Sequence, residues 1–100
     1  MSETEPKSQP ESLFPLGQLV ATPGAMQALE AAEQSFIDFV ARHVTGDWSE
    51  LDEHDQAENR FNVKNGMRIL SAYTLETGVK IWLITEADRS VTTILLPQEY

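Results

Sequence analysis

Strand-like patterning is concentrated in the second half of the chain, between Met67 and Leu96. Apolar and polar residues alternate there over short runs separated by turn residues, which is the pattern of half-buried strands. The first connection is Glu76-Thr77-Gly78, whose glycine is available for a positive φ, and the second runs from Thr85 to Ser90. The pattern predicts three consecutive antiparallel strands joined by two tight turns and ended by Pro97.

The first half of the chain predicts helices. Thr22-Pro23-Gly24 is a helix start, with threonine as the N-cap and proline at the first helical position. A second helix is expected from Ser35 to a glycine stop at Gly46, and a third from Ser49 to Asn65-Gly66. We expect the second helix to bury Phe36, Ile37, Val40 and Val44, and the third to bury Leu51, Ala57, Phe61 and Val63.

The segments before these helices differ in character. Met1 to Ser12 holds three glutamates, three serines and two prolines with almost nothing apolar, which predicts a disordered tail. Leu13 to Ala21 is apolar but interrupted by proline and glycine, which favours a short edge strand or an extended segment on the core, and Leu19 or Val20 could add a fourth strand. We therefore expect a tail over residues 1–12 and a single domain over residues 13–100.

The expected architecture is an α+β fold. Two or three N-terminal helices would pack on one face of a three- or four-stranded antiparallel β-meander. A three-stranded sheet alone is marginally stable, so the helices must cover it.

Charge narrows the classes of partner. Sixteen acidic residues against seven basic ones give a net charge of −9, which argues against direct binding of nucleic acid or anionic membranes. No apolar run approaches the roughly 20 residues that span a bilayer, and the N-terminus has no targeting pattern, so we expect a cytoplasmic protein. The chain has no cysteine, which excludes disulfides, thiol nucleophiles and cysteine-ligated metals, and no pattern indicates a cofactor.

Candidate chemistry gathers first around Arg42-His43 and Asp47-Trp48. His43 lies near the end of a predicted helix, where the helix dipole favours a cationic imidazole, and Asp47 could orient that imidazole. The simpler interpretation is a capping histidine paired with an aspartate. The alternative is an acid/base and anion-binding corner for RNA cleavage, with Trp48 as a stacking face beside Arg42.

The second turn of the predicted sheet is the other candidate, because Glu86, Asp88 and Arg89 stand at its tip and Thr92 follows. The simpler interpretation is a charged turn in which Asp88 bonds nearby backbone and Arg89 forms a surface ion pair. The alternative makes Arg89 a clamp for an oxyanion or phosphate, with Thr92 or Thr93 donating a hydroxyl. A catalytic site would then use His43, Arg68, Arg89 and Thr92.

Acidic residues cluster between Asp47 and Glu58. Most such runs are solvated helix faces, but regular carboxylates could also contact a protein partner or imitate DNA phosphates. Glu50, His54 and Glu58 repeat every four residues, as metal ligands on one helix face do; one helix supplies only part of a site, so we expect no metal. The candidate interaction residues are Glu50, Glu53, Asp55 and Glu58.

Two motifs resemble a known family. ARHVTGDW at residues 41–48 and ITEADRSVTTILLPQEY at residues 84–100, with the lead-in LGQLVATPGAMQAL from Leu16, are similar to those of small uncharacterised proteins of bacterial plasmids and integrative (mobile) elements. The resemblance spans about Phe14 to Tyr100 and implies a genetic setting without an established activity. Ser49 stands where the family usually has glycine, which favours a helix N-cap there. The layout of helices followed by a meander is also similar to that of barnase, colicin and RelE-like ribonucleases, an architectural likeness that says little about function.

These observations predict a small acidic, non-enzymatic interaction or regulatory protein of a mobile element, which binds a protein partner through its acidic helix and sheet. The alternative is a RelE/barnase-type ribonuclease toxin that uses His43, Arg89 and Thr92. Convergence of Arg42, His43, Arg68 and Arg89 in one pocket would favour the enzyme. An exposed edge of the third strand would also allow a homodimer by sheet extension. The sequence identifies neither the partner nor a substrate.

Overall fold

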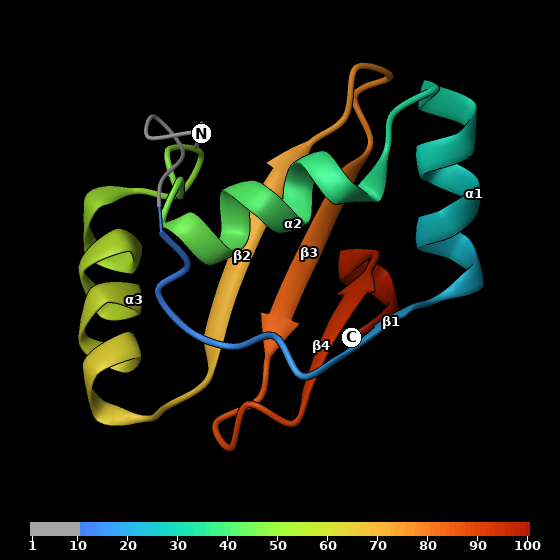
Figure 1. The fold of residues 1–100 in the computed structure, drawn as a ribbon. Helices are drawn as coiled ribbons and strands as arrows, with labels where there is room; N and C mark the ends of the chain where they lie inside the picture. The colour runs from blue at the N-terminus through green and yellow to red at the C-terminus, as the bar shows by residue number, and fades with distance from the viewer. Residues whose placement is uncertain (1–10) are drawn as a thin grey trace, which may run out of the picture.

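The described part of the chain forms one four-stranded sheet with three α-helices, drawn in Figure 1 from the computed structural model. The structure describes residues 11–100; residues 1–10, which hold most of the predicted disordered tail over residues 1–12, lie outside the described residues. In chain order the elements are β1 (Gln18–Ala21), α1 (Pro23–Ala32), α2 (Phe36–Thr45), α3 (Glu53–Asn65), β2 (Ile69–Thr74), β3 (Lys80–Thr85), β4 (Val91–Leu95) and the 3-10 helix η1 (Pro97–Glu99).

The sheet is mixed, with the strand order β1-β4-β3-β2. β2, β3 and β4 form the predicted antiparallel meander, and the α+β class is confirmed. β1 runs parallel to β4, so the prediction of a purely antiparallel sheet is wrong. The reason is that tight turns impose an antiparallel direction only on the strands that they join, whereas β1 is connected to the meander through all three helices. β1 holds Leu19 and Val20, which were expected to be able to add a fourth strand, and it covers the β4 edge through which sheet extension to a homodimer was considered.

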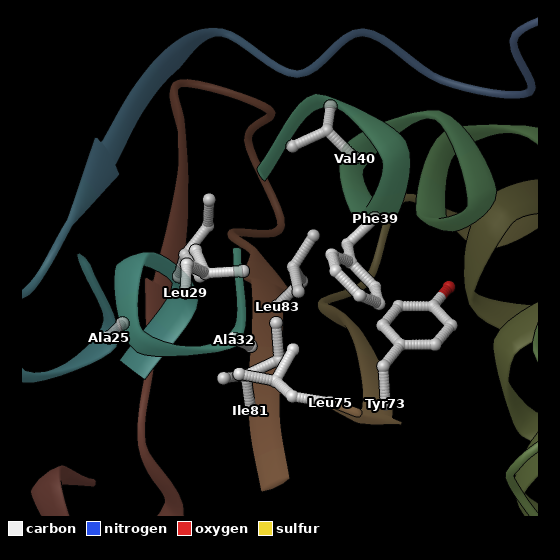
Figure 2. Close-up of a cluster of buried hydrophobic side chains, with 10 residues drawn as sticks. Ala25, Leu29, Ala32, Phe39, Val40, Tyr73, Leu75, Ile81 and Leu83 are labelled. Atoms are coloured by element: carbon white, nitrogen blue, oxygen red, sulfur yellow. The ribbon is translucent and has the colours of Figure 1, made fainter. Parts of the chain in front are cut away.

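Two helices, α1 and α2, cover one face of the sheet, and Figure 2 shows their side chains meeting those of the strands. Burying an aliphatic or aromatic side chain of this kind contributes about 1.5–3 kcal/mol, so this layer holds the helices on the sheet. No helix in the described part of the chain is long and apolar enough to cross a membrane. The main core contains Ala25, Leu29, Ala32, Phe39, Val40, Tyr73, Leu75, Ile81, Leu83 and Ile94.

The buried face of α2 is rotated from the predicted one. Ile37, expected inside, is 62% exposed, while Phe39 is buried. The cause is His43, whose burial centres the inward stripe on the side of the helix that also carries Phe39 and Val40, so that Ile37 falls at its outer margin.

The predicted helix caps are largely confirmed. Thr22 Oγ1 accepts a hydrogen bond from the Ala25 N–H, and Ser35 Oγ accepts one from the Ile37 N–H. Gly46 ends α2 in the left-handed region at φ 89°.

The third helix begins later than predicted, because Ser49 does not cap it. The Ser49 hydroxyl instead donates to Asp47 Oδ1 at 2.9 Å, in a turn closed by the hydrogen bond from the Leu51 N–H to the Trp48 carbonyl oxygen. Asp52 is the N-cap, and its Oδ1 accepts from the Asp55 N–H at 2.8 Å.

α3 lies along the edge of β2, beside the sheet (Figure 1). Asn59 replaces a neighbouring strand there: its side-chain amide donates to the Leu70 carbonyl oxygen at 2.8 Å, and its Oδ1 accepts from the Leu70 N–H at 3.4 Å. Asn59 is therefore buried, whereas Phe61, which was expected inside, is 58% exposed. Asn62, which donates to the Arg68 carbonyl, and Glu50, which accepts from the Thr74 N–H, cap the same edge.

Candidate functional site

A buried network of polar side chains is centred on His43, which has no exposed surface. His43 Nδ1 lies 2.5 Å from Ser71 Oγ, and Nε2 lies 2.8 Å from Thr85 Oγ1. Thr85 Oγ1 lies 2.7 Å from Thr92 Oγ1, and the Thr92 hydroxyl donates to the Leu16 carbonyl oxygen at 2.8 Å. This His43 network ties α2 to β2, β3 and β4, and ties β4 to the segment before β1.

The direction of each hydrogen bond in the His43 network follows from the carbonyl group of Leu16 at the end of the chain of contacts. The Leu16 carbonyl oxygen can only accept, so the Thr92 hydroxyl donates its hydrogen to that oxygen and accepts a hydrogen bond from the Thr85 hydroxyl. The Thr85 oxygen in turn accepts from the N–H of His43 Nε2, and Nδ1 accepts from the Ser71 hydroxyl. A neutral imidazole protonated on Nε2 satisfies every partner.

Burial keeps this imidazole neutral. It lowers the pKa of His43 from 6.5 to about 4, because the charged form loses its hydration. The predictions of a cationic capping imidazole and of a pair with Asp47 are wrong, because the two ring nitrogens meet the buried hydroxyls of Ser71 and Thr85 while Asp47 pairs with Arg42. The Phe14 ring covers the imidazole edge-on at a centroid distance of 5.2 Å.

Arg42 and Asp47 pair with each other. Arg42 Nε donates to Asp47 Oδ2 at 2.8 Å, and this hydrogen bond holds the pKa of Asp47 below its usual value. The Arg42 guanidinium stacks over Tyr73 at 4.4 Å from the ring centroid. Trp48 is buried, and its indole N–H donates to the His43 carbonyl oxygen at 3.2 Å.

In the second turn, the acids and the arginine have separate roles. Asp88 Oδ1 accepts from the hydroxyl and the N–H of Ser90, as predicted for a charged turn, and the hydroxyl lowers the pKa of Asp88. Arg89 makes no ion pair among the described residues; its guanidinium donates to the carbonyl oxygens of Met67, Glu86 and Asn62. The predicted surface ion pair of Arg89 is wrong, because its guanidinium is taken up by backbone carbonyl oxygens at the end of α3, before β2 and in its own turn.

The residues of the ribonuclease-like alternative do not form one pocket. Arg42 stacks on Tyr73 at the end of β2, and Arg89 binds Met67 before its start, six positions earlier and about 20 Å away along an extended chain. His43 and Thr92 share the His43 network, but both are fully buried. The Phe14 ring lies close to both the His43 imidazole and the Arg89 guanidinium. Arg68 pairs with Glu86 at 3.3 Å and donates to the Tyr100 hydroxyl.

An open groove lies between α3 and the sheet face that α1 and α2 leave uncovered. This α3 groove has a volume of about 620 Å³. Asp55 and Glu58 of α3 supply negative charge on one wall, together with the amides of Asn59 and Asn62. Arg68 also reaches the groove, but its charge is matched by Glu86. The apolar lining consists of Leu51, Met67, Leu70 and Trp82.

Apolar surface continues across α3 from this groove. A second hollow of about 470 Å³ shares Glu58, Asn62 and Met67 with the groove and adds Phe61. Phe61 is 58% exposed and Met67 is 49% exposed, so both side chains present apolar surface beside the carboxylates. The acidic helix predicted from the sequence therefore combines charge with exposed apolar side chains.

The predicted interaction residues do not act as one set. Glu53, Asp55 and Glu58 are exposed on α3, whereas Glu50 precedes the helix, bonds the Thr74 N–H and lies 3.7 Å from Arg42 Nη2. Glu50 is thus part of the structure that protects the β2 edge.

One group of side chains has the composition of a metal site. His54, Asp55 and Glu58 bring one potential ligand atom each within 4.8 Å of one another, and all three are exposed. Exposed acidic groups of this kind are common without an ion, and His54 and Glu58 form a surface pair at 4.0 Å. The group by itself indicates no metal site.

Sequence reasoning missed Ser71 and Thr85 in the His43 network, and Trp82 and Leu70 in the α3 groove. The signal for the network was present: Ser71, Thr85 and Thr92 occupy inward positions of three neighbouring strands, where apolar residues are the rule. Polar residues at such positions indicate a shared buried partner.

No protein-family model, curated protein or solved structure matches this sequence or fold.

Proposed function

We propose that this chain is a non-enzymatic interaction protein that binds a segment of a protein partner in the α3 groove. The observation that carries the proposal is the combination of an apolar lining with two carboxylates on one wall. The partner segment has basic side chains for Asp55 and Glu58 and apolar ones for Trp82 and Leu70. The setting on a mobile genetic element stays a prediction from the resemblance.

The chemistry of the groove supports a basic, apolar segment. A lysine or arginine over the indole of Trp82 gains a cation–π attraction of about 0.5–2 kcal/mol, in addition to its attraction to Asp55 and Glu58. The net charge of −9 raises the rate at which such a partner is encountered and lowers it for nucleic acid. Because these charges are screened by salt, the affinity decreases as ionic strength rises.

The positions of the former catalytic candidates support a binding role over catalysis. His43 and Thr92 have no exposed surface, and the guanidinium of Arg89 is occupied by backbone carbonyl groups. A general acid or base must come within hydrogen-bonding distance of its substrate. In this fold that would require the His43 network to open.

The test compares two variants with the same change in charge. Asp55→Asn/Glu58→Gln removes two carboxylates from the groove, and Glu30→Gln/Asp38→Asn removes two exposed carboxylates from α1 and α2. Partners retained from a host lysate are quantified by mass spectrometry, and the dissociation constant of each purified partner is measured by calorimetry. We expect each lost carboxylate to weaken binding by about 0.5–1 kcal/mol, so that the groove variant loses affinity by about fivefold to thirtyfold.

A second variant tests the apolar lining. Trp82→Ala removes the aromatic surface, and a buried interface tryptophan commonly contributes about 2 kcal/mol or more. The proposal requires that Trp82→Ala and the groove variant both lose the same partner, while the Glu30→Gln/Asp38→Asn protein keeps it. Equal dissociation constants for all three variants and the wild type would refute it.

A further inference from the structure

The two edges of the sheet differ in how far their backbone groups are hydrogen-bonded. At the β2 edge, Asn59, Asn62 and Glu50 hydrogen-bond the outward backbone groups of Leu70, Arg68 and Thr74. At the opposite edge, all four residues of β1 are exposed. Unprotected edge strands are sites at which a further strand can add.

The outward backbone groups of β1 can be identified from its pairing. The Gln18 N–H donates to the Ser90 carbonyl oxygen at 2.9 Å, and the Thr22 N–H donates to the Ile94 carbonyl oxygen at 3.0 Å. Alternate residues of a parallel strand turn to the same neighbour, so Leu19 and Ala21 direct their N–H and C=O groups away from β4. Within residues 11–100 these groups have no hydrogen-bond partner.

The chain segment that contains β1 is apolar and uncharged, and Glu99 lies beside its end, where its carboxylate accepts from the Thr22 hydroxyl at 2.6 Å. No charged residue occurs between Ser12 and Leu29, although 7 basic and 16 acidic residues are spread over the rest of the chain. Leu19, Val20 and Met26 remain 37%, 37% and 42% exposed and, with Phe36 and Ile94, line a hollow of about 150 Å³. On a protein of net charge −9, a second, equally acidic copy therefore meets few repelling charges along this edge.

We propose that β1 is a homodimer interface at which a second copy of this chain adds its own β1 in antiparallel direction, with Val20 on the twofold axis. This register places Leu19 opposite Ala21 of the second copy as a hydrogen-bonded pair, and the axis generates the same pair a second time. Every outward N–H and C=O group of Leu19 and Ala21 then has a partner. The sheet becomes continuous, with twice its four strands.

The alternating side chains of β1 explain why this register suits the edge. Val20 pairs with Thr93 and so faces the side of the sheet that α1 and α2 leave open, which lets two valines meet across the axis as a close, non-hydrogen-bonded pair. Leu19 pairs with Thr92 and faces the helical side, where Met26 lies beside it. The dimer carries its two α3 grooves at opposite ends of the joined sheet, and the inference stands independently of what the grooves bind.

Single-cysteine crosslinking tests the register, since the chain has no cysteine of its own. In the proposed dimer Val20→Cys lies opposite itself at a spacing that a disulfide spans, so mild oxidation with diamide converts it rapidly to a covalent dimer. Gln18→Cys lies opposite Thr22 of the second copy, and Ile37→Cys is on α2, so both form covalent dimer only at the slow collisional rate. Equal rates for the three variants, or faster reaction of Gln18→Cys, would overturn the proposal.

Sedimentation equilibrium of the unmodified chain tests the association itself. We expect the mass to rise with concentration from 11.2 kDa towards twice that value, and to rise further at high salt, which screens the repulsion between two acidic copies. Val20→Lys places like charges opposite each other and weakens dimerisation at least about tenfold, whereas the matched charge change Ile37→Lys leaves it unchanged. A mass of 11.2 kDa at every concentration, or equal effects of the two lysines, would show that β1 does not join copies of this chain.

Discussion

Acidification should destabilise this protein through one residue, His43. The imidazole has its ordinary pKa of 6.5 in the unfolded chain and a pKa of about 4 in the folded one. Between these values the unfolded chain binds a proton that the folded chain excludes. The stabilisation is therefore fully present above about pH 6.5 and is lost progressively as the pH falls towards 4.

The size of the effect follows from the two pKa values. A shift of one pKa unit corresponds to about 1.4 kcal/mol, and most of the shift has been traversed by about pH 5. The free energy of unfolding should therefore fall by about 2 kcal/mol between about pH 7.5 and about pH 5 on account of His43 alone. That is a large part of the 5–15 kcal/mol typical of a small domain.

Urea denaturation of the wild type and of His43→Gln isolates this contribution. Glutamine does not titrate, and the carboxyl groups whose pKa is lowered in the folded state, such as Asp47 and Asp88, are present in both proteins and cancel in the difference. The difference in free energy of unfolding between the wild type and His43→Gln should decrease by about 2 kcal/mol from about pH 7.5 to about pH 5. His54→Gln, at an exposed position, controls for loss of an imidazole and should stay within about 0.5 kcal/mol of the wild type. If the free energy of unfolding varied with pH in the same way for the wild type and for His43→Gln, the assignment of a buried neutral imidazole would be refuted.

Two further substitutions test local features, each against a matched control. Gly17→Ala and Gly66→Ala both place alanine at nearly the same positive φ, 65° and 66°, but only at Gly17 would the new Cβ meet backbone, at 2.4 Å. In urea denaturation, Gly66→Ala should lower the free energy of unfolding by about 1 kcal/mol, and Gly17→Ala should lower it clearly more. Equal losses would contradict the close approach of backbone to Gly17. Asn59→Ala should cost about 2–3 kcal/mol because it unpairs both backbone groups of Leu70, whereas the exposed Asn65→Ala should cost under about 1 kcal/mol. Similar losses for the two asparagines would contradict the role of Asn59 at the β2 edge.

The features that the sequence predicted well are those set by local chemistry. Thr22 and Ser35 cap helices because a side-chain oxygen can reach an N–H group two or three residues ahead. Gly46 and Gly78 adopt positive φ where a helix or hairpin turns. None of these depends on distant parts of the chain, so residue type and spacing suffice.

The features that the sequence did not predict depend on which strands become neighbours. β1 joined β4 in parallel because no tight turn constrained it. Asn59 became the inward residue of α3 because the helix lies beside an open strand edge, where an amide that both donates and accepts serves better than an apolar side chain. Periodicity alone favoured Phe61 for that position.

The candidate site shows the same division. The acids Asp55 and Glu58 could be identified from the sequence as a charged helix face. Their apolar counterparts Leu70 and Trp82 come from β2 and β3, and only the placement of α3 against the uncovered sheet face joins the two sets into a groove. His43 was predicted to cap a helix or to act as an acid or base, but it lies in the interior, because Ser71 of β2 and Thr85 of β3 supply it with polar partners.

The most direct measurement of partner binding at the α3 groove is photo-crosslinking in the host cell. A benzophenone amino acid is placed at Met67, which lines the groove, and in a second protein at Ile37, which is similarly exposed on α2. The account predicts a defined crosslinked partner from position 67 that is absent from position 37 and is lost when Asp55→Asn/Glu58→Gln is added. The same crosslinked proteins from both positions, unaffected by loss of the two carboxylates, would contradict it.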